Sequence, residues 1–299
     1  MTELAGTATT SRSPRQPSEV RRRRPGRIRD VVIVAVTVVA CVTIAFPFAW
    51  MVVTSFFPTT ELFSVTRLLP RIGTATLTNY VQLLTESNFL TYIGNSLIVS
   101  VCAMTVSVVL SSMSGYAFSR YRFRGRRAIM VAIIAVHLFP FVILITPMYS
   151  FFSELGLLNT HLGLIIAYVA ITLPFASYLM LGFFQTIPIS LDEAARVDGC
   201  GTVSVLFRIV LPVAWPGIAT VAVNAFILSW EEYLFAKVLV TDDNLKTVQV
   251  GLANFFGEFT TRWDLVMAAS VLASVPTILL FAVAQRRLVS GLAAGGVKE

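Results

Sequence analysis

The residues most able to do chemistry gather in residues 188–212, the longest polar, small-residue stretch that interrupts otherwise apolar sequence. Ser190 and Glu193 stand three residues apart, the spacing at which a hydroxyl and a carboxylate cap the first turn of a helix reciprocally. Gly199 then supplies a helix stop. We predict a short, isolated helix over about 190–198. If capping were its only role, these side chains would stabilise it by about 1 kcal/mol.

Residue types that carry catalysis or bind metals show no recognisable pattern elsewhere in the sequence. A phosphate-binding glycine loop, an HExxH zinc motif, a GxSxG nucleophile elbow and paired cysteines are all missing. Cys41, Cys102 and Cys200 lack metal-ligand spacing, so we expect unpaired core thiols. His137 lies in an apolar run, where a hydrogen-bonded packing role is favoured over a proton relay. We therefore expect no catalytic residue, no metal site and no cofactor in this chain.

The composition places the chain among membrane proteins. Of its 299 residues 56% are hydrophobic and 13% charged, and the mean hydropathy is +0.78. The formal charge of +7 suggests nucleic acid at first, but the basic residues cluster beside apolar runs without interleaved aromatic residues. Membrane topology explains them better, and we expect no nucleic-acid partner.

The apolar runs predict a single all-α membrane domain over residues 30–288. A disordered basic tail over residues 1–29 precedes it, and a C-terminal tail over 289–299 follows. The first loop is expected to carry a short surface helix around 78–84. Six transmembrane helices are predicted, at about 31–56, 93–118, 128–149, 162–186, 212–235 and 265–284.

The distribution of positive charge orients these spans. With both termini inside, 18 of the 23 Lys and Arg residues fall on the cytoplasmic side and five on the outer side. Cytoplasmic loops of membrane proteins carry the excess of Lys and Arg. The sequence therefore predicts cytoplasmic termini and a cytoplasmic position for residues 188–212.

The polar stretch also carries a spaced motif. Glu193-Ala194-Ala195 is followed after three residues by Gly199, after nine more by Ile209, and then by Leu211-Pro212. This pattern resembles the EAA signature of permease subunits in bacterial ATP-binding-cassette (ABC) importers. It lies in the expected cytoplasmic loop before the penultimate span.

Three further segments resemble the carbohydrate-uptake branch of that family, the maltose-type inner-membrane permeases. They are residues 114–126 after the second span, residues 226–235 in the fifth, and residues 285–298 at the end. The likeness extends over about residues 30–298. One departure concerns the solute, because the branch usually has Asn where Glu231 stands here.

The resemblance implies the architecture of a type I ABC importer permease, in which the short cytoplasmic helix couples the spans to an ATPase. The residues it assigns to coupling are Glu193, Ala194, Ala195, Asp198 and Gly199. Small side chains let a groove on the ATPase approach the helix backbone, and charges, Asp192 among them, give the docked helix its register. We expect Glu193, Ala194 and Ala195 to face this partner.

The same resemblance implies a set of partners. These are a cytosolic ATPase dimer that carries ATP and Mg²⁺, a second permease subunit in a heterodimer, and an extracytoplasmic solute-binding protein. The solute implied is a sugar or oligosaccharide, and the location is the bacterial cell membrane, which the chain crosses several times.

Polar residues of the fifth span are the candidates for the solute pathway. Aromatic faces and hydrogen-bonding side chains bind sugars, which favours Asn224 and Trp230. Glu231 and Glu232 come near the outer interface, where Glu231 is equally well explained as an exposed helix end.

An ion-coupled secondary carrier or channel that works without an ATPase is the alternative function. It would need acids or a charged relay inside the membrane, and the spans offer only His137 and two carboxylates at a helix end, Glu231 and Glu232. An intramembrane enzyme is supported less, because no nucleophile and base can be paired.

Overall fold

The structure is a computed structural model that describes residues 27–62, 72–138, 140–257 and 261–295, with side chains from residue 30 to residue 285 within these ranges except that of residue 72. The predicted basic tail up to residue 26 and the last four residues of the predicted C-terminal tail lie outside the described residues. The chain forms two compact units, residues 1–48 and residues 49–299.

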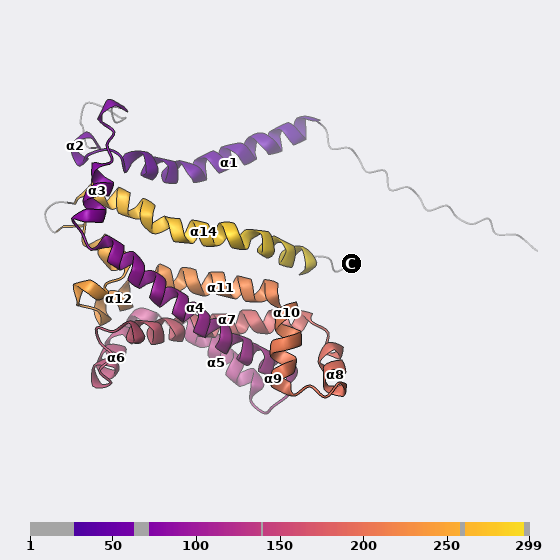
Figure 1. Cartoon of the computed structure of the whole chain (residues 1–299). Helices are drawn as coiled ribbons and strands as arrows, with labels where there is room; N and C mark the ends of the chain where they lie inside the picture. Colours follow the sequence, from indigo (N-terminus) through magenta and orange to yellow (C-terminus); the bar gives the residue numbers. More distant parts are fainter. Residues whose placement is uncertain (1–26, 63–71, 139, 258–260, 296–299) are drawn as a thin grey trace, which may run out of the picture. The chain divides into compact units, whose positions relative to one another are not determined.

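Long apolar helices make up most of the described chain (Figure 1). Four of them are long and apolar enough to cross a membrane, and two bent helix pairs raise the number of candidate spans to as many as six. The regular elements among the described residues are all helical, which confirms the predicted all-α membrane fold. The four long helices are α1 (Arg27–Thr54), α4 (Phe89–Arg120), α7 (His161–Thr186) and α14 (Trp263–Gly295).

Short helices lie in the loops between the long ones. The surface helix predicted around 78–84 is confirmed by α3. In chain order the short elements are α2 (Thr59–Leu62), η1 (Ile72–Thr74), α3 (Thr78–Thr85), α8 (Ser190–Val197), α9 (Thr202–Ser204), η2 (Val205–Val210), α10 (Leu211–Val213), α12 (Leu234–Leu239), η3 (Asp243–Leu245) and α13 (Val248–Ala253).

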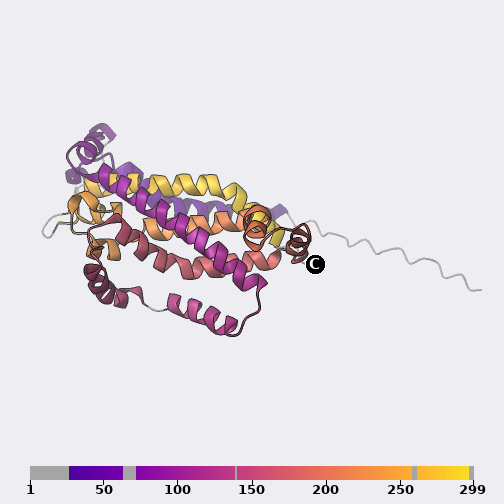
Figure 2. The ribbon, with the colours of Figure 1, turned by 60° about the horizontal axis from the view of Figure 1, so that its bottom comes forward.

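Two predicted continuous spans are bent helix pairs instead. The run 128–149 consists of α5 (Arg126–Leu138) and α6 (Phe141–Glu154), whose axes differ by 96°; Figure 2 shows their different directions. The fifth span starts as a helical segment at residue 202 and bends by 85° before α11 (Trp215–Trp230). Prolines explain both breaks, because Pro140 is the N-cap of α6 and Pro216 lies in the first turn of α11.

A seam of small residues brings α4 and α7 close together. Gly115 permits the tightest contact, because a Cβ atom added there would lie 2.8 Å from the Cβ of Met180. Hydroxyl pairs cross the seam, with 2.7 Å between Ser107 and Thr172. Small residues let membrane helices approach closely enough for such bonds. Six of the buried small residues of α4 recur every three or four positions: Ser96, Ser100, Ala103, Ser107, Ser111 and Gly115. Ser112 is buried beside them.

The first turns of α4 hold the loop that follows α12. The side-chain amide of Asn95 donates to the carbonyl oxygens of Asn244 and Lys246, at 2.8 and 3.0 Å. The backbone N–H of Val248 donates to the Ser96 hydroxyl at 2.8 Å. These hydrogen bonds fix the loop after α12 to the start of α4.

Candidate functional site

The polar stretch forms α8, but its first turn is not capped as predicted. Ile189 is the N-cap and has helical backbone angles, φ −66° and ψ −27°, with no side-chain capping bond. Ser190 is already inside the helix, and the N–H groups of Asp192 and Glu193 donate to the Ile189 carbonyl at 2.9 and 3.2 Å. The predicted capping box is wrong, because the backbone turn that begins before Ser190 supplies these acceptors. Glu193 therefore has no capping role.

The other end of α8 matches the prediction. Gly199 has φ +84°, the left-handed conformation, in which a side chain would be strained. Its N–H donates to the Arg196 carbonyl, and the N–H of Cys200 donates to the Ala195 carbonyl, both at 3.0 Å. These bonds close the helix in the way that a glycine C-cap requires.

Opposite faces of α8 differ in exposure. Glu193, Ala194, Arg196, Val197 and Asp198 are exposed, as is the following Gly199. This exposed face of α8 carries both signs of charge on a helix that is only eight residues long. This charged face is open to solvent.

Two residues expected at the partner surface are buried instead. Ala195 is 4% exposed and packs in an apolar cluster with Phe184, Val205 and Leu206. Asp192 is 3% exposed. The prediction that Ala195 faces the partner, and the use of Asp192 in docking register, are corrected, because α8 rests on the rest of the chain through these two positions.

The buried carboxylate of Asp192 is paired within the chain. Its Oδ1 accepts from the Tyr116 hydroxyl at 2.6 Å, and its Oδ2 accepts from Arg120 Nε at 3.0 Å. Arg120 also donates from Nη1 to the Phe184 carbonyl at 3.2 Å and from Nη2 to the Ile187 carbonyl at 3.0 Å. We call Tyr116, Arg120 and Asp192 the α8 anchor.

The predicted pathway residues separate into different roles. Trp230 is 2% exposed, stacks on Phe226 with ring centroids 5.6 Å apart, and donates from Nε1 to the Ala273 carbonyl at 3.1 Å. It packs α11 against α14, so its prediction as a sugar-stacking residue is corrected. Asn224 is half-buried on α11, and Glu231 is the exposed C-cap of that helix.

Glu232 also has a structural contact that the sequence did not reveal. Its carboxylate oxygens accept from the backbone N–H groups of Phe235 and Ala236, at 2.9 and 3.1 Å. It therefore satisfies the first turn of α12, as an acidic side chain at a helix start does.

Within the described part of the chain, His137 and the cysteines show no sign of a reactive or metal-binding site. The His137 ring stacks on Phe175, with centroids 5.4 Å apart and planes 15° apart, while its Nδ1 has no hydrogen-bond partner among the described residues. The cysteines are free thiols, but Cys41 and Cys102 are exposed rather than buried in a core. Across the described ranges, no group of three His, Cys, Asp or Glu residues could hold a metal ion.

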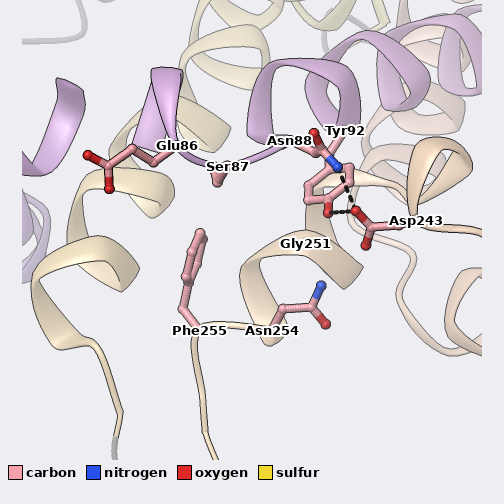
Figure 3. A pocket seen from close by; sticks show the side chains of 8 residues that line it. All are labelled: Glu86, Ser87, Asn88, Tyr92, Asp243, Gly251, Asn254 and Phe255. Carbon is pink, nitrogen blue, oxygen red and sulfur yellow. Dashed lines mark hydrogen bonds between the residues drawn. The ribbon is translucent and has the colours of Figure 1, made fainter. Parts of the chain in front are cut away.

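A hollow of about 290 Å³, which no sequence pattern predicted, lies beside the start of α4 (Figure 3). Asp243 is its central polar group: Oδ2 accepts from Asn88 Nδ2 at 2.6 Å and from the Tyr92 hydroxyl at 2.9 Å. The hydrogen bond from Lys246 is the main cause that lowers the pKa of Asp243 from 3.8 to about 2. The α4-start hollow is lined by Glu86, Ser87, Asn88, Tyr92, Asp243, Gly251, Asn254 and Phe255.

The hollow and the α8 anchor lie at opposite ends of α4. Tyr92 lines the hollow and Arg120 belongs to the anchor, and at 1.5 Å per residue they are separated by about 42 Å of helix. This separation exceeds the thickness of the hydrocarbon core of a bilayer, about 30 Å. The two polar regions therefore fit opposite sides of a membrane.

Comparison with solved structures identifies the same fold elsewhere. A bacterial ABC transporter involved in the import of the acidic polysaccharide alginate has a chain that superposes with a TM-score of 0.75. The match covers 87% of this chain and 96% of that chain, at 23% identity. The likeness confirms the predicted fold.

Sequence comparison identifies the family. The profile described as "Binding-protein-dependent transport system inner membrane component" matches residues 107–293, which include α8 and its anchor. The chain is 37% identical to the inner membrane ABC transporter permease protein YcjP of Escherichia coli (strain K12), over 85% of this chain and 91% of that protein. It is 33% identical to the trehalose/maltose transport system permease protein MalG of Thermococcus litoralis, over 91% and 98%. The chain therefore belongs to the inner membrane components of binding-protein-dependent transport systems, as a membrane-spanning ABC transporter permease and not an enzyme.

Proposed function

We propose that this permease moves a sugar or oligosaccharide into the cell, driven by ATP that a separate subunit hydrolyses. The relatives support this solute class, because they include permeases named for trehalose and maltose, for diacetylchitobiose and for arabinooligosaccharides. The observation that carries the coupling half of the proposal is α8, a short helix with one face buried in this chain and a charged face exposed.

The partner of the exposed face of α8 is a cytosolic ATPase dimer, which holds ATP and Mg²⁺. Glu193 and Asp198 offer carboxylates for charge-assisted hydrogen bonds, and Ala194 lets the partner approach the backbone. Gly199 shapes the end of the helix that docks. The excess of Lys and Arg on this side supports a cytoplasmic position for α8 and for both termini.

The opposite end of the chain receives the solute. An extracytoplasmic solute-binding protein docks near the α4-start hollow, and the solute crosses between this chain and a second, different permease. One neighbour in fold, with a TM-score of 0.64, was solved as an alginate transporter in complex with an alginate pentasaccharide-bound periplasmic protein. Asn224 and Glu231 on α11 are the side chains we place along the solute path.

Transport by the reconstituted complex tests this function. The chain is combined in proteoliposomes with an ATPase, a second permease and a solute-binding protein that co-purify with it from its own cell. Uptake of labelled maltose, trehalose and diacetylchitobiose is then measured with and without ATP. We expect ATP-dependent uptake of at least one of them. Uptake by this chain alone, driven by an ion gradient, would instead establish the ion-coupled carrier.

A charge-neutral variant tests the role of Glu193. Glu193→Gln keeps the size of the side chain and removes its charge. Loss of one docking contact is expected to reduce uptake per ATP hydrolysed by about tenfold. Glu154→Gln, at the exposed end of α6, is the matched control and is expected to transport normally. Normal coupling in Glu193→Gln would rule out an ionic contact at this position.

A further inference from the structure

Three separate elements meet at the α8 anchor. Asp192 comes from the first turn of α8, and Tyr116 and Arg120 come from the last turns of α4. The carbonyl groups that Arg120 reaches, those of Phe184 and Ile187, belong to the end of α7 and the residue that caps it. The anchor therefore joins α8 to both members of the tightly packed α4–α7 pair.

The arginine side chain suits this arrangement. A guanidinium group is planar and presents its N–H donors in fixed directions. Arg120 uses Nε for the α8 carboxylate and its two terminal nitrogens for the α7 carbonyls. A lysine ammonium on a flexible stem would not hold these three acceptors in one geometry.

Stability alone does not explain a buried ion pair at this place. The side chains of Arg120 and Asp192 are each 4% exposed, so both charges have lost contact with water. Well-packed apolar side chains of similar volume often stabilise a fold as much as such a pair does, or more. In some proteins a buried charged pair instead serves to specify one geometry. Tyr116 adds to that geometry, because it also packs edge-on against Phe184, with centroids 5.9 Å apart.

The chain between α8 and α11 is irregular and bent, unlike the hydrogen-bonded contact between α8 and the α4–α7 pair. It passes through η2, a π-helical segment, and then through the 85° bend at Ala214. Helical segments of this type and sharp bends are places where a helix changes direction. The anchor therefore joins α8 to α4 and α7 through an ion pair and hydrogen bonds, whereas the chain connection from α8 to α11 runs through a bent joint against which Ala195 makes apolar contacts.

We propose that Tyr116, Arg120 and Asp192 are positioning residues that make α8 move as one body with α4 and α7. A movement imposed on the exposed face of α8 is then passed through the anchor to these two helices, while α11 turns at the joint near Ala214. The inference rests on the proposed function, because it needs an ATPase that moves α8.

Distances between spin labels in the complete transporter test the inference without knowledge of the solute. Labels are attached at Ser190 on α8, at Val106 on α4 and at Leu228 on α11, in a chain whose three cysteines are replaced by alanine. All three positions are exposed, and Val106 lies about 21 Å along α4 from Arg120. Pulsed electron paramagnetic resonance then measures the distance between the two labels of each pair, with and without a non-hydrolysable ATP analogue and Mg²⁺.

In a transporter whose anchor residues are unchanged, the Ser190–Val106 distance is expected to stay constant when the nucleotide binds. The Ser190–Leu228 distance is expected to change. In Asp192→Ala, the Ser190–Val106 distribution should broaden or shift with nucleotide, and uptake per ATP should fall by about tenfold. Asp264→Ala is the matched control, because it breaks a second Arg–Asp pair among the described residues, the one with Arg262 at 3.0 Å. It should leave both distances as in the wild type.

A Ser190–Val106 distance that shifts with nucleotide in the wild type would overturn the inference. An unchanged distribution in Asp192→Ala would do so as well. If Asp192→Ala does not assemble with the ATPase, Tyr116→Phe removes a single hydrogen bond and is expected to broaden the same distribution to a smaller degree. The proposed function fails separately, if the wild-type chain does not bind the ATPase or shows no ATP-dependent uptake.

Discussion

Gly251 of α13 lies directly against the ring of Tyr92 on α4, so that a Cβ atom added at Gly251 would overlap the ring atom Cδ2. This close contact leaves the Tyr92 hydroxyl 2.9 Å from Asp243 in the α4-start hollow. The position therefore requires glycine because of space, whereas Gly199 requires it because of its backbone angles.

Gly251→Ala is expected to destabilise the chain by about 1–3 kcal/mol, because the added methyl group forces the Tyr92 ring or α13 to move. Gly94→Ala is the matched control, since a Cβ atom there meets nothing within 4 Å and alanine is a better helix residue. Thermal unfolding of both variants in detergent measures the difference. Equal stability of the two would show that the hollow accommodates the methyl group.

The stabilising contacts of Asp243 should weaken as the pH falls from about 4 to about 2. Its folded pKa of about 2 lies below the ordinary 3.8, so the ionised carboxylate contributes stability that is complete above pH 3.8 and is lost as the pH falls toward 2. The stability difference between the wild type and Asp243→Asn should be constant at higher pH and shrink below about pH 4. Denaturant unfolding across this range measures it, and a difference unchanged at pH 2 would contradict the assignment.

Trp230 is expected to matter for stability rather than for solute binding. Trp230→Ala removes a buried indole between α11 and α14 and should cost about 3–5 kcal/mol. Trp230→Phe keeps a ring to stack on Phe226 but loses the hydrogen bond to Ala273, about 1 kcal/mol, and part of the indole volume, so it should cost less than Trp230→Ala. If the Trp230→Phe variant is stable but its KM for uptake is markedly altered, Trp230 contacts the solute after all.

Replacement of Gly199 should depend on the new residue's tolerance of a left-handed backbone. Gly199→Ala is expected to cost about 1–2 kcal/mol, whereas Gly199→Asn should cost less, because asparagine adopts this conformation more readily. Hydrogen exchange at the amides of Gly199 and Cys200 reports the loosening of the α8 end. Identical exchange in the two variants would mean that the helix ends in another way when glycine is absent.

Much of the fold and one part of the site could be read from local sequence. Apolar runs long enough for a bilayer and clusters of arginine predict the helices and their orientation, since both depend only on residue type along the chain. The EAA-type spacing located α8, and Gly199 marked its end. The prolines indicated bends, but the sequence did not show that residues 126–154 form two separate helices.

The tertiary structure decided which side chains of α8 are free. Asp192 and Glu193 are adjacent acidic residues with similar local sequence, yet Arg120, 72 positions earlier, pairs with the first and leaves the second exposed. Trp230 likewise becomes a packing residue only because Ala273 of another helix accepts its hydrogen bond. Residue type and spacing determine what the chain can form locally, but burial depends on contacts between segments far apart in sequence. Burial distinguishes the anchoring carboxylate of Asp192 from the exposed carboxylate of Glu193.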